Sequence, residues 1–217
     1  MHIEPGIVVG GKLMLGWITT TGCLGWFCHK FVTQTSLRDF TLSILKYSAA
    51  IMIAFCCFVL LPHPSLGVSE VHFILATTMF LFLGALPTGL GLTTALILQS
   101  VFISPTDLPQ LGMNLTTLLA PLLLMAGLAR SLRTKSPAQL RYIEILKLSA
   151  AYQAGIVGWV SFWVLWGQGF HVETFQQLMV FALGYAPLMI MEPILDMLAI
   201  KVWKPKTLAF HTQPSYA

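Results

Sequence analysis

Long runs of apolar residues, broken by short polar segments, follow one another along the whole chain. A helix needs about 20 apolar residues to cross the hydrocarbon core of a bilayer. Most of the runs reach that length, so the pattern predicts an all-α, polytopic membrane bundle of about seven helices, forming a single integral membrane domain over residues 1–217. The expected spans cover residues 8–32, 40–61, 71–86, 87–103, 111–129, 145–166 and 176–202.

The third and fourth spans share one apolar run, residues 71–103, which is too long for a single crossing. Gly84, Pro87, Gly89 and Gly91 interrupt it. Clustered Gly and Pro residues mark turns, so we expect a tight turn near the middle of the run.

The composition agrees with a membrane protein. Of 217 residues, 56% are hydrophobic and 9% are charged, whereas a soluble domain carries roughly 25% charged residues. No sizeable soluble domain fits between the spans. The net charge of +4 comes from loops on one side of the predicted bundle and therefore does not indicate binding to nucleic acid. The expected partner is the lipid bilayer.

The loops alternate in charge and predict the orientation. The connections near residues 62–64, 104–107 and 167–173 contain no Lys or Arg. Basic loops stay in the cytoplasm, so we expect a multi-pass protein of the cell (inner) membrane with its N-terminus outside and its C-terminus inside. The basic residues of the other connections and the tail are Lys30, Arg38, Arg130, Arg133, Lys135, Arg141, Lys147, Lys201, Lys204 and Lys206.

The first two residues carry candidate chemistry. The start has no basic segment or cleavage site of a signal peptide, and the large side chain of His2 disfavours removal of Met1, so we expect Met1 to be retained. A metal ion can take the Met1 amine, the deprotonated His2 amide and the His2 imidazole at three corners of a square, which leaves a fourth corner for another ligand. Such a nitrogen set suits Ni(II) and Cu(II), and low-spin Co(II) as well. Taken alone, the dipeptide is more often a stray His at a disordered terminus.

Polar residues from separate segments share one expected depth. In the seven-span topology, His2, Ser69, His72, Gln99 and Asn114 all fall near the outer membrane surface. Polar side chains within spans usually face the bundle interior or a cavity, so we predict a site there, closed by the N-terminus. The alternative is that Gln99 and Asn114 only join helices by hydrogen bonds.

Other titratable residues lie outside this layer. Glu192 and Asp196 are four residues apart on one face of the last span, and Glu192 is roughly 24 Å from the outer end at helical rise. That depth excludes metal contact and predicts a coupling role; the alternative is a pair of charges at the inner interface near Lys201. His63 and His171 are expected in outer loops, as capture ligands or as solvated residues.

Several familiar functions are not supported. The segment GIVVGGK resembles a phosphate loop, but Leu13 stands where a Mg²⁺-binding Ser or Thr is required, so no ATP site is expected. The glycines of the first span instead offer a small-residue surface for helix contact. No HExxH motif or paired His-rich helix is present, which argues against an enzyme.

The motifs resemble the substrate-binding membrane component of cobalt and nickel energy-coupling-factor transporters, the CbiM/NikM family. The family starts MHIxxG, and this chain starts MHIEPG. Its Pro-rich stretch with a terminal His element corresponds to PHPSLGVSEVH, with Ser69 and His72 matching. Its remaining elements correspond to Leu98-Gln99, to Leu111-Gly112-Met113-Asn114, and to Pro187 with Glu192. Departures are Val68 and Glu70 beside the His element, Tyr185-Ala186 for a family His, and Pro193 after Glu192; they bear on the metal preference.

The resemblance implies a Co(II) or Ni(II) import subunit without a resident cofactor. Its metal ligands would be the Met1 amine, the His2 amide and imidazole, and His72, with Ser69, Gln99 and Asn114 around them. It also implies a transmembrane coupling subunit and cytoplasmic ATPase subunits as partners. The alternatives are an intramembrane metalloenzyme, which needs an open coordination position and a positioned acid or base, and an accessory membrane protein.

Overall fold

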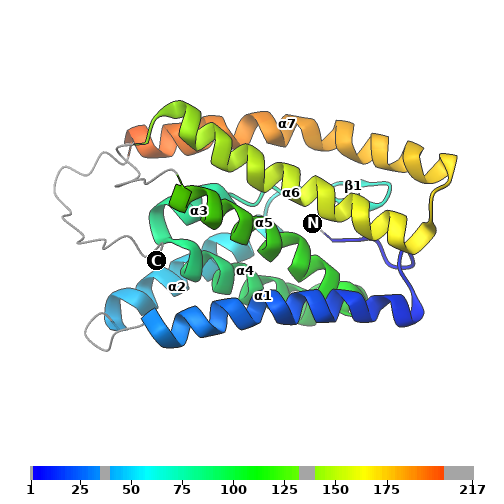
Figure 1. Cartoon of the computed structure of the whole chain (residues 1–217), viewed down its shortest axis with the longest axis horizontal. Coiled ribbons are helices and arrows are strands. Elements are labelled where there is room, and N and C mark those ends of the chain that lie inside the picture. The colour runs from blue at the N-terminus through cyan, green and yellow to red at the C-terminus, as the bar shows by residue number, and fades with distance from the viewer. Residues whose placement is uncertain (1, 35–39, 132–139, 203–217) are drawn as a thin grey trace.

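The computed structural model describes residues 2–34, 40–131 and 140–202, and these residues form a bundle of roughly aligned helices (Figure 1). The α-helices are α1 (Leu13–Gln34), α2 (Phe40–Val59), α3 (Ala76–Leu83), α4 (Ala85–Phe102), α5 (Leu111–Ser131), α6 (Tyr142–Gln168) and α7 (Val172–Val202). Two 3-10 helices, η1 (Gly10–Lys12) and η3 (Pro105–Gln110), precede α1 and α5.

The predicted membrane bundle is confirmed, but a count of seven crossings is not. Among the described residues, five helices are long and apolar enough to span a bilayer: α2, α4, α5 with η3, α6 and α7. Helix α1 has 22 residues, but three consecutive threonines, Thr19 to Thr21, make it less apolar than the others.

The expected span over residues 71–86 is wrong. Residues 71–75 are not helical, and α3 contains only 8 residues, which is about 12 Å at helical rise. Gly84, with φ of 94°, lies between α3 and α4. This positive φ favours glycine, so the expected turn near the middle of the apolar run is present.

Helix α5 lies at the centre of the bundle. It packs against α1, α4 and α6, while α2 packs on α4 and α7 packs on α6 (Figure 1). The short helix α3 contacts α4, α6 and α7. Side chains from these helices form one continuous apolar core.

Glycine allows α1 and α5 to approach closely. A Cβ on Gly16 would lie 2.6 Å from Met113 Cγ, and a Cβ on Gly112 would lie 2.9 Å from Trp17 N. At the same crossing, the Thr20 and Thr116 hydroxyls are 2.8 Å apart. Gly16 therefore serves packing inside the chain.

The chain before α1 folds back into the end of the bundle as a strand. Strands β1 (Ser65–Leu66) and β2 (Ser69–Glu70) form an antiparallel hairpin, and Ile3 pairs with Ser69 on its free edge. Ile3 and Val8 are fully buried. The first helix consequently begins after η1 at Leu13, later than the expected residue 8.

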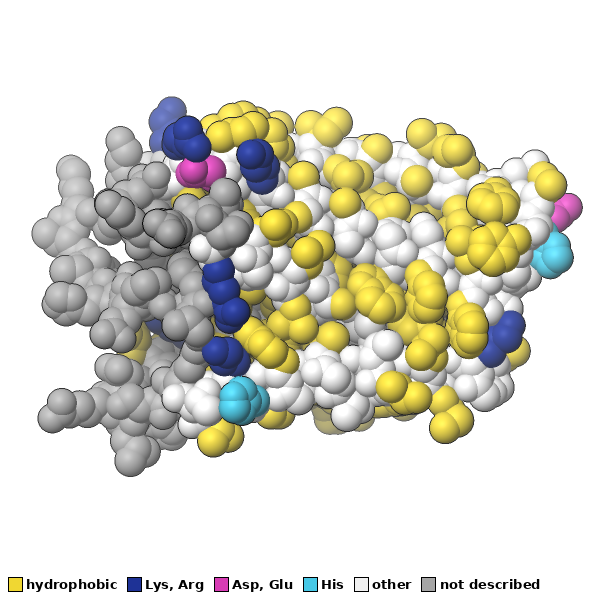
Figure 2. Space-filling model, in the orientation of Figure 1, with side chains coloured by type: hydrophobic (Ala, Val, Ile, Leu, Met, Phe, Trp, Pro, Cys, Tyr) yellow, Lys and Arg dark blue, Asp and Glu magenta, His cyan; other side chains and the backbone are white. Residues whose placement is uncertain are grey.

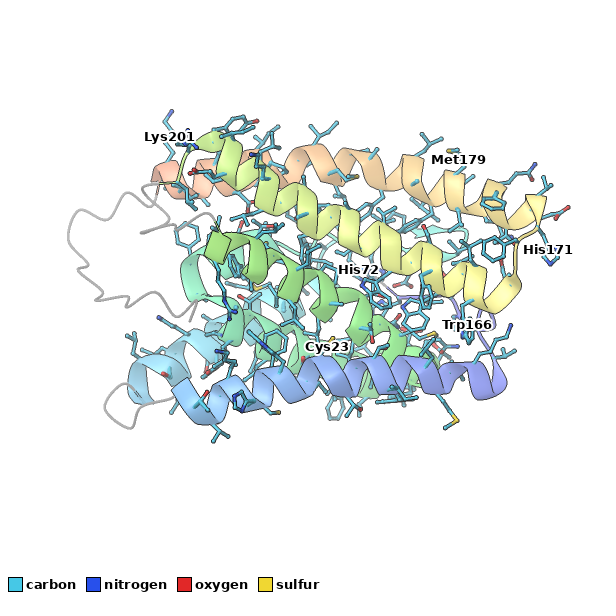
Figure 3. The ribbon with its side chains drawn as sticks, in the orientation of Figure 1. Cys23, His72, Trp166, His171, Met179 and Lys201 are labelled. Carbon is cyan, nitrogen blue, oxygen red and sulfur yellow. The ribbon has the colours of Figure 1, made fainter. Side chains whose placement is uncertain are left out.

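The surface has an apolar middle and polar ends. Figure 2 shows hydrophobic side chains along the visible face and most Lys and Arg side chains toward one end. Lys201 and His171 lie at opposite ends of the molecule (Figure 3). Lys12, on the His171 side, donates hydrogen bonds to the carbonyl oxygens of Trp166 and Gly167 at 2.9 and 3.1 Å, so its charge stabilises the C-terminal end of α6.

Candidate metal centre

Two histidines and a carboxylate converge inside the bundle. The ligand atoms of His2, Glu70 and His72 all lie within 4.8 Å of one another. Both imidazoles are 1% exposed, and their ring centroids are 4.7 Å apart at an interplanar angle of 82°. Figure 3 shows His72 in the interior, between the helices. The structure thus brings together the N-terminus and the Pro-rich loop, as the sequence predicts.

Strand geometry explains this convergence. Glu70 and His72 are two residues apart on an extended segment, so their side chains point to the same side. The Ile3–Ser69 pair sets His2 beside Glu70, and the Glu70 N–H donates to the His2 carbonyl at 3.0 Å. The side chain of Ser69 points to the opposite side of β2 from Glu70 and is fully buried. Its hydroxyl donates a hydrogen bond to the His2 carbonyl at 2.9 Å.

One oxygen of Glu70 faces three imidazoles. Its Oε2 lies 3.0 Å from His2 Nδ1, 3.6 Å from His72 Nε2 and 3.7 Å from His63 Nδ1. The His63 ring stacks on the His72 ring with centroids 4.9 Å apart and planes 2° apart. His63 therefore borders the cluster on its solvent-facing side, where its side chain is 39% exposed.

Burial keeps the imidazoles neutral. It lowers the pKa of His2 to about 4, and it also lowers the pKa of His72. Burial opposes ionisation of Glu70, but the hydrogen bond with His2, together with favourable electrostatic interactions with His2 and His63, outweighs it and holds the pKa of this carboxyl below its ordinary value. Near pH 7 the cluster thus combines an anionic oxygen with neutral ring nitrogens, which are the forms that bind metals.

The surrounding polar residues are buried, and two of them hold the N-terminal strand. Asn114 Oδ1 accepts a hydrogen bond from the Ile3 N–H at 2.9 Å, as Ser69 fixes the His2 carbonyl. Gln99 is 2% exposed at the end of α4. Among the described residues, Gln99 Oε1, Asn114 Nδ2 and His2 Nε2 have no hydrogen-bond partner. Met1 lies outside the described residues, so its amine remains a predicted ligand.

Comparison with known proteins agrees with this arrangement. The family described as cobalt uptake substrate-specific transmembrane region, CbiM, matches residues 2–206. The chain belongs to the CbiM family. A crystal structure described as that of a truncated transition metal transporter has a similar fold, with a TM-score of 0.63 and 17% sequence identity over 93% of this chain and 96% of that one. No curated protein matches the sequence.

As a CbiM-family member, the chain is a substrate-specific membrane component of a metal uptake transporter. The family match includes His2 and His72. The structural likeness extends over most of both chains, so the helical bundle as a whole belongs to the shared fold.

In this CbiM-family chain, Glu192 is tied to the backbone that follows His72, and it is not among the residues whose ligand atoms converge. Its carboxylate accepts hydrogen bonds from the N–H groups of Ile74 and Leu75, at 3.3 and 3.1 Å, close after His72 in the chain. Residues 71–75 are not helical, so the N–H groups of Ile74 and Leu75 pair with α7 instead of with their own helix. Gln153 donates a further hydrogen bond to the carboxylate.

Asp196 also lies inside the bundle rather than at the inner interface. It is 1% exposed and accepts a hydrogen bond from the Thr78 hydroxyl. Together with Glu192, it ties α7 to the segment that continues from His72 into α3.

Glu70 is the residue that sequence reasoning missed. It appeared only as a departure from the family pattern beside the His element. The spacing Glu70-Val71-His72 was the available signal, since residues two apart share one side of a strand. The signal requires that the segment be extended, whereas its apolar composition predicted the start of a helix.

Proposed function

We propose that the chain is the metal-binding membrane subunit of an energy-coupling-factor importer of Co(II) or Ni(II). The observation that carries the proposal is that His2 and His72, which belong to two segments joined by the Ile3–Ser69 pair, are buried against each other inside a membrane bundle. The ion is the transported substrate, and its proposed ligands are the Met1 amine, the His2 amide and imidazole, and His72.

The N-terminal strand supports this ligand set. A terminal chelate binds an ion tightly only when its atoms are held together, because ordering a free terminus costs conformational entropy. Here Ser69 and Asn114 hold the backbone at His2 and Ile3. The folded chain therefore orients the His2 imidazole toward His72 before metal arrives, which favours tight binding.

Active uptake requires partners. The sequence has no phosphate loop, so the chain needs a transmembrane coupling subunit and cytoplasmic ATPase subunits to concentrate the ion. Glu192 fits a coupling role, because it joins α7 to the backbone that follows His72. An open small-residue face for contact with the coupling subunit is offered by Gly22 and Gly25 in α1 and by Gly11 in η1 just before it, because added Cβ atoms there would meet nothing within 4 Å.

Blocking the amine tests the proposal. We expect one residue added before Met1, or acetylation of the amine, to abolish tight binding of Ni(II) and Co(II), because the fused chelate rings require a free terminal nitrogen. Calorimetry on the purified full chain in detergent measures this affinity. The same residue added after Ala217 is the control and should leave the affinity unchanged. Equal affinity in all three proteins would refute amine ligation.

A further inference from the structure

The carboxylate of Glu70 has a position that hydrogen bonding to one histidine does not explain. A single hydrogen bond to His2 Nδ1 would satisfy one lone pair of Oε2. The same oxygen also lies 3.6 Å from His72 Nε2 and 3.7 Å from His63 Nδ1. Three ring nitrogens from three separate segments thus surround one anionic oxygen.

These separations match those of ligand atoms around one ion. Two ligand atoms that are each about 2.1 Å from a shared metal lie about 3.0 Å apart at a right angle and about 3.4 Å apart at the tetrahedral angle. The distance from Glu70 Oε2 to His2 Nδ1, 3.0 Å, agrees with the first value. The distance to His72 Nε2, 3.6 Å, is slightly longer than the second.

The nitrogen of His2 that faces Glu70 is also the one that the terminal chelate uses. Nδ1 is the ring nitrogen nearer to the backbone, so it closes the smaller and more favourable ring with the His2 amide nitrogen. An ion at Nδ1 takes the place of the proton that His2 shares with Glu70, and that proton moves to Nε2 as the neutral ring changes tautomer. The ion therefore meets the carboxylate oxygen without any rearrangement of the strand.

We infer that Glu70 is itself a ligand of the transported ion and that it shifts the preference of the site from Ni(II) toward Co(II). This inference rests on the proposed function and specifies its substrate. Four nitrogens in a plane suit Ni(II), which is diamagnetic in that geometry. An added carboxylate oxygen makes the site five-coordinate, so Ni(II) becomes paramagnetic and loses the advantage of the planar state, whereas Co(II) accepts five ligands readily.

The test compares wild-type chain with Glu70→Gln, each purified in full length and loaded separately with Ni(II) and Co(II). We expect paramagnetic Ni(II) in the wild type and diamagnetic, planar Ni(II) in the variant, read from visible absorption and magnetic susceptibility. We also expect the ratio of Co(II) to Ni(II) affinity, measured by competition calorimetry, to fall by about tenfold or more, since even residues behind the ligands change affinity by 10–100-fold.

Two further variants keep the test decisive. Glu4→Gln changes a carboxylate on the N-terminal segment, two residues after His2. This carboxylate accepts a hydrogen bond from the Ser65 hydroxyl, so the variant should behave as wild type. Glu70→Asp retains a carboxylate with a shorter reach and should keep part of the paramagnetic Ni(II) signal, even if Glu70→Gln fails to fold.

The outcomes separate the two claims. Identical spectra and affinity ratios in wild type, Glu70→Gln and Glu70→Asp would overturn the role of Glu70 and leave the proposed function intact, provided that amine acetylation still abolishes binding. Diamagnetic, planar Ni(II) in the wild type would also overturn it. A wild-type chain that binds neither metal would instead refute the proposed function.

Discussion

At the scale of single residues, the proposed metal binding depends on imidazoles that are neutral before the ion arrives. Burial lowers the pKa of His2 to about 4, so near pH 7 the ring is neutral, and metal binding at Nδ1 requires only that its single proton move to Nε2. The same burial leaves few water molecules to compete for the ion. The two histidines thus contribute affinity through their surroundings as well as through their nitrogen atoms.

Replacing His72 should separate this site from the exposed histidines. We expect His72→Ala to lose metal binding and uptake while the protein still inserts, because the ring is 1% exposed and faces His2. Calorimetry and cellular metal content measure the two effects. His171→Ala, in the connection between α6 and α7, is the matched control and should have no effect on binding or uptake. Loss of uptake in the His171 variant alone would place the site elsewhere.

The sequence could predict the histidines but not the complete cluster. His2 and His72 carry recognisable chemistry in a recognisable pattern, and their neighbours Ser69 and Asn114 follow from depth in the bundle. Glu70 could not be assigned, because its role depends on an extended backbone that only the pairing with Ile3 establishes. The contact of Glu192 with the backbone after His72 could not be predicted either, because it depends on the same non-helical segment.

At the scale of elements, hydropathy identifies apolar runs but not what surrounds them. Residues 71–86 read as a membrane span, yet their first part is irregular backbone within the protein. Irregular backbone is tolerated at membrane depth only where protein or a cavity surrounds it. Here the Glu192 carboxylate, from a distant helix, satisfies the N–H groups of Ile74 and Leu75, and no local sequence pattern signals such a partner.

The α1–α5 crossing allows a test of the packing. We expect Gly16→Ala to destabilise the chain by about 1–3 kcal/mol, the usual cost of overpacking, because the new Cβ would lie 2.6 Å from Met113 Cγ. Gly22→Ala, where a Cβ meets nothing within 4 Å, should change stability little. Thermal unfolding in detergent compares them. Equal melting temperatures would mean that α1 and α5 lie farther apart.

At the scale of the whole molecule, the charged ends and apolar middle define a direction across the membrane. The proposal requires the end that carries His171 to face outward, since the ion arrives from outside. The basic end, with Lys201, then faces the cytoplasm.

Cysteine labelling tests this orientation. In a background without Cys23, Cys28, Cys56 and Cys57, an impermeant thiol reagent on intact cells should label Phe170→Cys, since that position is 76% exposed. It should not label Lys201→Cys until the cells are opened. Asp107 also lies in a connection that is expected outside, but it is only 8% exposed, so a cysteine at that position would be labelled poorly. Labelling at 201 from outside would invert the topology.

The strand that carries His2 has a consequence for the order of synthesis. Its partners come much later in the chain: Asn114 is 111 residues from Ile3, and Trp166 is 154 residues from Lys12. Residues 2–12 therefore cannot reach their final contacts until α5 and α6 have been made. Contacts of such long sequence separation form slowly. In the proposed orientation this segment lies outside the membrane before those partners exist, so the proposed metal centre is among the last parts of the protein to assemble.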